Sequence, residues 1–225
     1  MASEPKSRRL VASDRNRGSL TPDSWISAAT DVLADHGIDS VRLDVLARTL
    51  NVTRGSFYWH FRDREDLLRR VLQAWRQRTT EQLTARLESA STDPVTQLRD
   101  LISLPFRGRS AIRVARIELA IRAWARRDEL ARAFMDEADA SRMGYIAQVF
   151  SSLGFSIGEA RSHSFLLYSY VVAESLFSTP ASAAQRQQRT AILEQPVIEK
   201  ILTHLGLQAR APPRSPARGP LLQAA

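Results

Sequence analysis

The residues with the clearest chemical potential lie in one short stretch, 53–61, which is rich in aromatic and hydrogen-bonding side chains. Phe57 and Phe61 are four residues apart, so on a helix they share one face and should pack inward. The remaining side chains then face away from the core, and they are Arg54, Gly55, Ser56, Tyr58, Trp59 and His60. A face of this composition can bind phosphates and base edges, so the stretch predicts a nucleic-acid contact.

The first three of these residues offer contacts at the start of the helix. Arg54 can bind either a phosphate or the O6/N7 edge of guanine. Gly55 has no side chain, so the backbone can come close to a nucleic acid there. Ser56 can hydrogen-bond either a base edge or a phosphate. The sequence leaves these alternatives open.

The other three outward residues are aromatic. Tyr58 and His60 can donate to phosphates, and their apolar bodies can touch thymine methyl groups. Trp59 can read an apolar base surface or clamp the sugar-phosphate wall. A solvated amphipathic turn is the alternative, but adjacent exposed aromatic residues beside a basic group indicate a partner. We expect no metal at His60, because the other histidines are distant in sequence and no carboxylate has a ligand-like spacing.

Two short helices joined by a tight turn are predicted to position this face. Residues 43–50 place leucines and an alanine on one side, and Asn51 tolerates the left-handed conformation that follows a helix end. Val52 then plugs the core at the corner, and Thr53 can cap the second helix. Such a pair is a helix-turn-helix, here over about residues 42–61, whose second helix enters the major groove of DNA.

This region resembles the signature of the TetR/AcrR family of transcriptional regulators. In that family a helix with Ile-Ala leads to Gly-Val-Ser, then to a Gly-Thr-Leu-Tyr-x-His-Phe recognition helix and a Lys-Glu-x-Leu helix start. The same order is followed here by Leu46-Ala47, Val52-Thr53, residues 55–61 and Arg64-Glu65-Asp66-Leu67. The resemblance covers roughly residues 20–75. Two positions depart from the pattern, because Arg42 replaces a Thr or Ser cap and Asn51 replaces the usual glycine.

The resemblance implies DNA contacts beyond the outward face of the second helix. Arg64 stands where the family often has a phosphate-contacting lysine, and Arg42 offers a guanidinium in place of a hydroxyl. The implied DNA-binding set is Arg42, Leu43, Thr53, Arg54, Gly55, Ser56, Tyr58, Trp59, His60 and Arg64. A homodimer on a roughly palindromic double-stranded DNA operator is also implied.

The whole chain is predicted to be all-α. Helix signals recur, such as Thr21-Pro22-Asp23 at a start and Gly37 at an end, and no segment sustains the period-two alternation of a strand. We expect about nine helices, in a three-helix head joined through a fourth helix to a C-terminal TetR-like bundle. The predicted divisions are a flexible basic arm (1–18), the DNA-binding domain (19–79), an effector-binding and dimerisation bundle (80–207) and a disordered tail rich in proline and arginine (208–225).

Composition supports nucleic-acid binding and excludes several chemistries. The 225 residues hold 32 Lys and Arg against 24 Asp and Glu, a net charge of +8, and much of the excess lies in the two tails. The basic arm either is solvated or lies along the minor groove. The absence of cysteine excludes disulfides, thiolate metal sites and a thiol nucleophile. No apolar run reaches the ~18 residues of a membrane span and no secretory signal is visible, so we expect a cytoplasmic, nucleoid-associated protein.

The resemblance also implies an effector pocket and a dimer interface in the bundle. An aromatic ring or a polar tip on an apolar stretch suggests pocket positions, and these are Phe106, Trp124, Tyr145, Tyr168 and Glu174. Apolar stripes on the last two predicted helices, 156–178 and 196–205, suggest the interface: Leu167, Val171, Ile198, Ile201, Leu202 and Leu205. Packing in the core or an interface is the alternative for each pocket residue.

These observations predict a ligand-responsive repressor that binds its operator as a homodimer. The effector would be a small apolar or amphipathic molecule, and we expect no metal, cofactor or membrane partner. The alternative is a DNA-binding regulator without a small-molecule effector, gated by a protein partner or acting as an activator. An enzyme is not expected, because the sequence has no glycine-rich phosphate loop, no cysteine nucleophile and no G-x-S-x-G motif.

Overall fold

The computed structural model describes residues 20–104 and 108–176, together with the single positions 185, 188, 191, 195 and 203. Within the two long ranges every regular element is helical, which confirms the all-α prediction. The α-helices are α1 (Pro22–His36), α2 (Leu43–Thr49), α3 (Arg64–Arg76), α4 (Gln82–Ala90), α5 (Pro94–Ser103), α6 (Gly108–Ala125), α7 (Glu129–Ser152) and α8 (Ile157–Leu176). The last predicted helix, 196–205, lies almost entirely outside the described residues, as do the predicted basic arm and tail.

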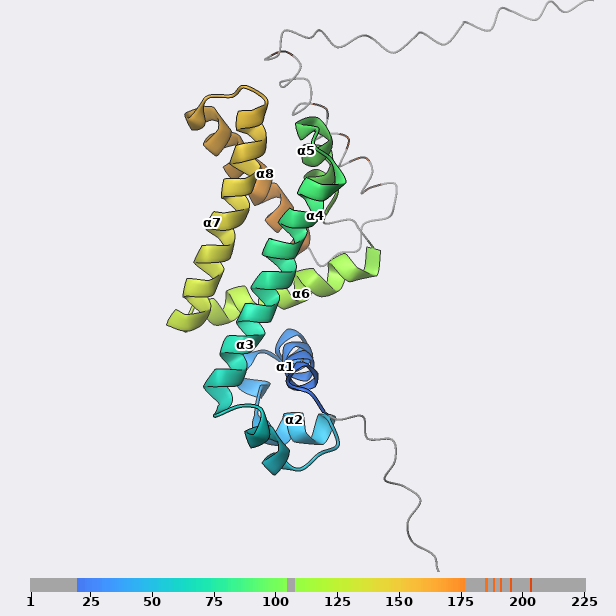
Figure 1. The fold of residues 1–225 in the computed structure, drawn as a ribbon, viewed down its shortest axis with the longest axis vertical. Coiled ribbons are helices and arrows are strands. Elements are labelled where there is room, and N and C mark those ends of the chain that lie inside the picture. The colour runs from blue at the N-terminus through green and yellow to red at the C-terminus, as the bar shows by residue number, and fades with distance from the viewer. Residues whose placement is uncertain are drawn as a thin grey trace, which may run out of the picture.

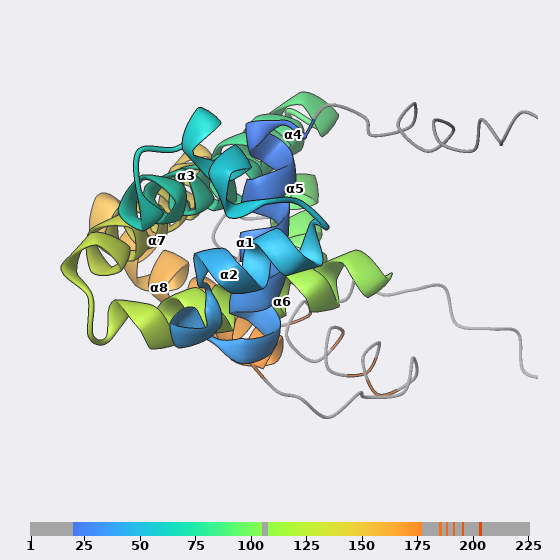
Figure 2. The ribbon, with the colours of Figure 1, turned by 90° about the horizontal axis from the view of Figure 1, so that it is seen from below.

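The head lies at one end of the molecule and the bundle extends away from it (Figure 1). Helices α1 and α2 belong to the head, and α6 crosses directly beyond α1. In the bundle, α7 packs along α8, and α5 packs against both. Figure 2 views the molecule from the head end, with α1 and α2 in front of the bundle. Among the described residues no helix is both long and apolar enough to cross a membrane.

One continuous helical stretch connects the head to the bundle. Helix α3 passes into η3 (Gln77–Glu81), a π-helical turn, and then into α4 without a break. The backbone stays in the right-handed helical region on both sides of this turn. A π-helical turn pairs residues five apart instead of four, and such turns are frequent at functional sites. The predicted boundary between the two domains, at residue 79, falls inside η3.

Helix α1 begins and ends where the sequence predicts. Thr21 precedes it in an extended conformation, and Pro22 occupies the first turn, where its missing N–H costs nothing. The Thr21 hydroxyl lies 3.3 Å from the Ser24 hydroxyl and does not bond the free backbone N–H groups of the first turn. Gly37 ends the helix at φ +79°, a conformation that most other residues adopt only with strain.

The hydrophobic core of the head continues into the bundle. Trp25 and Leu33 of α1 share one buried cluster with Phe57 and with Leu72 of α3. The same cluster includes side chains of α6 and α7, namely Ile117, Ile121, Trp124, Ala125, Ala131, Met135 and Ala138. The head is therefore seated on α6 and the first half of α7, in addition to its covalent link through α3.

Ion pairs on the surface reinforce this seat. Arg116 of α6 binds Asp35 of α1 at 2.6 Å, and Arg113 binds Asp31 about one turn away. All four side chains are about half-exposed, so each pair contributes less than ~1 kcal/mol to stability. Apolar burial, not charge, holds the head on the bundle.

A second buried cluster fills the far end of the bundle. It joins Leu87 of α4, Ile102 of α5, Phe150 of α7 and Leu167 of α8. Helix α5 is fixed at its start by Asp93, whose carboxylate accepts the backbone N–H of Thr96 at 2.9 Å, as a helix cap does. The bundle therefore has two buried apolar clusters, one under the head and one at its far end.

Candidate nucleic-acid interface and ligand cavity

The turn of the helix-turn-helix is closed by a complete set of backbone hydrogen bonds. Asn51 has φ +53°, the left-handed conformation that the sequence predicts for it. Its N–H bonds the carbonyl of Arg48 at 3.1 Å, and the N–H of Val52 bonds the carbonyl of Ala47 at 2.9 Å. These two bonds form the Schellman motif, which ends α2 sharply and fixes the direction of the next segment.

The second helix of the motif is η2 (Arg54–Trp59), a 3-10 helix where the sequence suggests an α-helix. Thr53 precedes it in an extended conformation, but its hydroxyl makes no capping bond. The Ser56 hydroxyl instead donates to the Thr53 carbonyl at 3.0 Å. A 3-10 helix has three residues per turn, so consecutive outward side chains are spread more widely than on an α-helix.

The inward face of η2 is anchored by aromatic packing. The Phe57 ring meets Trp25 edge to face, with centroids 5.3 Å apart, and stacks on Phe61 at 5.1 Å. Both phenylalanines are buried, as predicted. Edge-to-face and offset contacts of this kind add specific geometry to apolar burial. They hold the short helix in one orientation although it makes few backbone hydrogen bonds.

The outward face of η2 stands in solvent. Trp59 is 86% exposed and Tyr58 is 62% exposed, and the Arg54 side chain is exposed with no hydrogen bond or ion pair to any described residue. His60 is half-buried, with its ring against the edge of Phe61. A Cβ at Gly55 would meet only the Thr53 hydroxyl, at 3.8 Å, so the fold itself does not require glycine there.

Three other predicted DNA contacts already have partners inside the chain. Arg42 makes a two-point contact with Asp44, at 3.1 and 3.2 Å, and this hydrogen bond holds the pKa of the Asp44 carboxyl below its usual range. Leu43 is partly buried against the core of the head. Arg64 has the most constrained side chain of the three, because it is bound to backbone carbonyls.

Arg64 ties the start of α3 to the loop before α2. Its Nε donates to the Val41 carbonyl at 2.7 Å and its Nη2 donates to the Ile38 carbonyl at 2.9 Å. These bonds satisfy backbone carbonyls at the end of η1 (Ile38–Ser40) and so brace the whole motif. The sequence pattern suggested only a phosphate contact for this residue.

Arg62 is a candidate DNA contact that the sequence reasoning missed. It directly follows the aromatic stretch, is exposed, and its guanidinium has no hydrogen bond or ion pair with a described residue. The family pattern extends past this position but singles out Arg64 and assigns no contact to Arg62. Arg54 and Arg62 thus flank the exposed aromatic pair, and neither guanidinium is hydrogen-bonded to another residue that the structure describes.

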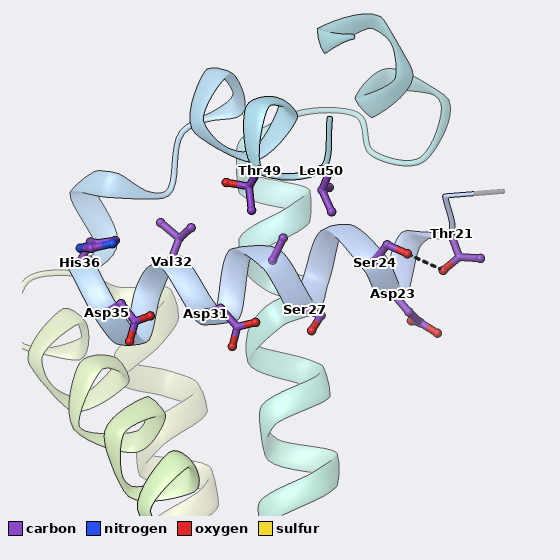
Figure 3. A pocket seen from close by; sticks show the side chains of 11 residues that line it. Thr21, Asp23, Ser24, Ser27, Asp31, Val32, Asp35, His36, Thr49 and Leu50 are labelled. Carbon is purple, nitrogen blue, oxygen red and sulfur yellow. Dashed lines mark hydrogen bonds between the residues drawn. The ribbon is translucent and has the colours of Figure 1, made fainter. Parts of the chain in front are cut away.

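The opposite side of the head carries acidic groups. Figure 3 shows a shallow hollow along α1, with Asp23, Asp31 and Asp35 on the helix and Thr49 and Leu50 of the α2 end across from it. Two of these carboxylates bind arginines of α6, as described above. Carboxylates repel phosphates, so this surface favours approach of a polyanion from the η2 side instead.

A cavity of about 430 Å³ lies in the bundle between α4, α6, α7 and α8. Leucine, valine, alanine and isoleucine side chains form most of its wall, and Tyr145 and Tyr168 of the predicted pocket set line it. Volume and lining are typical of sites for small molecules. Val171, predicted for the dimer interface, also lines this cavity.

A buried network of charges borders the cavity. Arg142 of α7 donates to Glu118 of α6 at 2.9 Å and to the Tyr168 hydroxyl at 3.1 Å. It also donates to the hydroxyls of Thr79 and Thr80 in η3, at 3.0 and 3.1 Å. Burial lowers the pKa of Arg142, but the charge attraction and hydrogen bonds of Glu118 and Tyr168 together outweigh this, so the pKa lies above its ordinary value. One guanidinium therefore connects α6, α7, α8 and the π-helical turn.

A second arginine completes the network. Arg122 donates to Glu118 at 2.8 Å and to Asp139 at 2.7 Å, and the Tyr168 hydroxyl donates to Asp139 at 2.5 Å. Burial, opposed in part by Arg142 and aided by Glu118, raises the pKa of Tyr168 to about 12. Two cations face two carboxylates here, so the network is balanced in charge. The sequence reasoning singled out only Tyr168.

The remaining predicted pocket residues lie elsewhere. Trp124 is buried in the cluster that seats the head and is not among the residues that line the cavity. Glu174 is half-buried on α8 and is also absent from the lining. Phe106 lies outside the described residues. In the part of the chain that the structure describes, no group of three His, Asp or Glu side chains could hold a metal ion.

Leu167, which was predicted for the dimer interface, is already covered within the single chain. Leu167 is buried within it, because it shares the face of α8 that packs on α7 with Ser164 and Tyr168. The apolar side chains that α8 exposes are instead its neighbours Phe165 and Leu166. The other predicted interface residues, Ile198, Ile201, Leu202 and Leu205, lie outside the described residues.

The sequence matches to known proteins lie mainly in the head. A family model described as bacterial regulatory proteins, tetR family, matches residues 26–71. The "Probable acrEF/envCD operon repressor" of Escherichia coli strain K12 is 39% identical over 83 residues, which is 36% of either chain. An HTH-type transcriptional repressor of Mycobacterium tuberculosis is 39% identical over 54 residues, 24% of this chain and 21% of its own. The chain thus matches about a third or less of the length of these relatives.

Solved structures extend the likeness to the bundle. A transcriptional regulator from Rhodococcus sp. Rha1 has a TM-score of 0.66 at 19% identity, over 82% of this chain and 97% of its own. A regulator from Saccharomonospora viridis, solved in complex with choline, has a TM-score of 0.63 at 16% identity, over 79% and 95%. At these identities the likeness shows the fold. The matched head is therefore that of the TetR/AcrR family of transcriptional regulators, and the chain as a whole has the fold of the solved regulators.

Proposed function

We propose that this chain is a homodimeric repressor that binds a palindromic DNA operator and releases it when a small molecule fills the cavity of the bundle. The observation that carries the proposal is the exposed face of η2. There Tyr58 and Trp59 stand in solvent beside Arg54, which no described residue binds, on a short helix that follows a turn closed by backbone hydrogen bonds. An exposed aromatic pair beside a cation fits a DNA groove and its phosphate wall.

Several findings support the separate parts of the proposal. The names of two relatives that match the head describe repressors, which favours repression over activation and a regulator over an enzyme. A two-fold dimer would present two copies of η2 about one helical turn of DNA apart, ~34 Å, which is why we expect a palindromic operator. The protein would act on DNA in the cytoplasm, at the nucleoid.

The dimer part has its own structural support. Phe165 and Leu166 on α8 are 62% and 65% exposed, an unusual position for two adjacent large apolar side chains. Replacing both with aspartate should convert the protein from dimer to monomer in light scattering. A dimer of unchanged strength would mean that α8 does not form the interface.

The effector part rests on the cavity and its connection to η3. A neighbour with the same fold was solved with choline bound, which supports the idea that this fold holds small molecules. A ligand can shift the protein away from its DNA-binding conformation only by binding another conformation more tightly. Because Arg142 links the cavity to Thr79 and Thr80, a ligand that alters its contacts would change the segment between bundle and head.

The DNA-binding proposal is tested by selecting bound DNA from a random library and measuring affinity for the recovered site by fluorescence anisotropy. The double variant Tyr58→Ala, Trp59→Ala should bind that site at least about tenfold more weakly. Its thermal unfolding should match the wild type, since neither side chain is buried. Ile112→Ala, which removes a similarly exposed apolar side chain from α6, is the control and should bind normally. Equal affinity in all three proteins would overturn the assignment of η2.

A further inference from the structure

The residues that line the cavity in the bundle carry more positive than negative charge. Its charged lining residues are Arg78, Arg86, Arg142 and Glu118, so three cations stand against one carboxylate. Glu118 is already bound by both buried arginines of the network. It therefore has little capacity left to attract a cationic ligand.

The excess charge comes from two arginines at the exposed edge of the cavity. Arg78 in η3 and Arg86 in α4 line the cavity, and both are exposed. Neither guanidinium has a hydrogen bond or ion pair with any described residue. An unpaired arginine presents a planar fork of donors that matches a carboxylate or a phosphate.

One polar group inside the cavity also lacks a partner. The Tyr145 hydroxyl is buried and has no hydrogen-bond partner in the described part of the chain. Burial, together with the nearby carboxylates of Glu88 and Asp100, raises the pKa of this phenol, so the hydroxyl keeps its proton. A buried, protonated donor without an acceptor suits a ligand that brings an oxygen atom.

The wall between these polar points is apolar. Leu83 and Leu87 of α4, Val114 of α6 and Ile146 of α7 all line the cavity. Apolar walls reward a ligand with a hydrocarbon body, since burying that body removes it from water. Exposed cations at the edge and apolar walls inside together describe the shape of an amphipathic molecule.

We propose that the effector of this protein is an amphipathic organic anion, whose hydrocarbon body fills the apolar cavity and whose acidic group binds Arg78 and Arg86. This inference deepens the proposed function, because it names the chemical class of ligand for the cavity on which that function depends. It excludes lipophilic cations as the preferred class. The buried pair of Arg142 and Glu118 stays intact in this arrangement and forms a polar part of the cavity wall.

The test uses full-length protein and probes that differ only in charge. Isothermal titration calorimetry compares decanoate with decan-1-ol and with decyltrimethylammonium, and 2-naphthoate with 2-naphthylmethanol to allow for a rigid body. Each anion should bind at least about tenfold more tightly than its uncharged partner, and the cation should bind more weakly still. Equal or tighter binding of an alcohol or of the cation overturns the proposal, as does no binding of either anion.

Two double variants with the same change in charge locate the effect. Arg78→Gln, Arg86→Gln should lose about tenfold in anion affinity while the alcohols bind within twofold of wild type. Arg126→Gln, Arg127→Gln removes two exposed arginines at the α6 end that do not line the cavity, and should change neither. Unchanged anion affinity in the first double variant overturns the proposal.

Measuring operator affinity in the presence of each probe distinguishes a failure of the ligand class from a failure of the proposed function. An anion that binds as described and also weakens operator binding supports both. An anion that binds through Arg78 and Arg86 without changing operator affinity supports the ligand class and contradicts the ligand-responsive repressor. Release of the operator by the cationic probe alone supports the repressor and overturns the ligand class.

Discussion

The head and the bundle place their arginines in opposite environments. In the head, Arg54 lies in solvent beside Tyr58 and Trp59 and binds nothing within the described chain. In the bundle, Arg122 and Arg142 are largely buried, and carboxylates and hydroxyls bind them on several sides. The exposed arginine is available to a partner outside the molecule, whereas the buried pair joins helices to each other. The same residue type is therefore left open to an external partner at one end and organises the chain internally at the other.

The strongest test of this contrast removes the shared carboxylate of the buried network. Glu118→Leu leaves two cations facing a single carboxylate, Asp139, in a poorly solvated site, and breaking a buried pair in this way costs about 3–5 kcal/mol of unfolding free energy. Urea unfolding at fixed protein concentration measures it. Asp136→Leu breaks an exposed pair with Arg132 at 3.7 Å and should cost less than ~1 kcal/mol. Similar losses in both variants would mean that the network is no more important than a surface ion pair.

The next test addresses the exposed arginine. Arg54→Ala should weaken operator binding by about 1–3 kcal/mol, roughly 5- to 150-fold, and leave unfolding unchanged. Arg127→Ala is the matched control, an exposed arginine far along the chain from η2. If the lost contact is a phosphate, the salt dependence of binding should flatten; if it is guanine, discrimination at one base pair should fall. If the Arg54 variant lost stability but kept its operator affinity, Arg54 would be a stabilising residue and not a DNA contact.

The pH dependence of the network gives a third, intermediate effect. The pKa of Tyr168 lies at about 12, above the ordinary value of 10. The stability that this raised pKa represents is fully present below pH 10 and is lost as pH rises to about 12. Absorbance at 295 nm, as the difference between wild type and Tyr168→Phe, should therefore show one step near pH 12. A step near pH 10 would show that the hydroxyl is free of the network.

The smallest effect is expected at the surface pairs between head and bundle. Asp31→Asn with Asp35→Asn should cost less than ~1 kcal/mol, and the cost should shrink further in high salt because exposed charges are screened. The loss in Glu118→Leu, by contrast, should barely respond to salt. A large, salt-independent loss in the aspartate double variant would indicate that charge, not apolar burial, seats the head.

The recognition motif could be predicted from sequence because its determinants are local. Phe57 and Phe61 bury themselves through their own spacing, and Asn51 adopts its left-handed conformation within one turn of chain. Even there, two features escaped prediction. η2 is a 3-10 helix, and Arg64 bonds carbonyls more than twenty residues earlier in the chain. Neither follows from a pattern of residue types.

The cavity was harder to predict because its parts are distant in sequence. Arg142 meets Glu118 from 24 residues away and Thr79 from 63 residues away. Each of these residues alone looks like an ordinary charged or polar position on a helix. The burial of Leu167 was missed for a related reason, since one apolar stripe does not tell whether it faces a helix of the same chain or of a second copy. Only the packing of α7 on α8 decides that.

The π-helical turn has a consequence for how this chain tolerates insertions and deletions. An α-helix rotates by roughly 100° per residue, so losing one residue within α3 or α4 would turn every later side chain by about that angle. The apolar face that packs under the head and the face that lines the cavity would then no longer align. Within η3 (Gln77–Glu81), one residue is already in excess of the α-helical repeat. A single deletion there relaxes the turn to α-helix and keeps both faces in phase, so η3 is the one place in the long helix where its length can change by a residue without twisting the head.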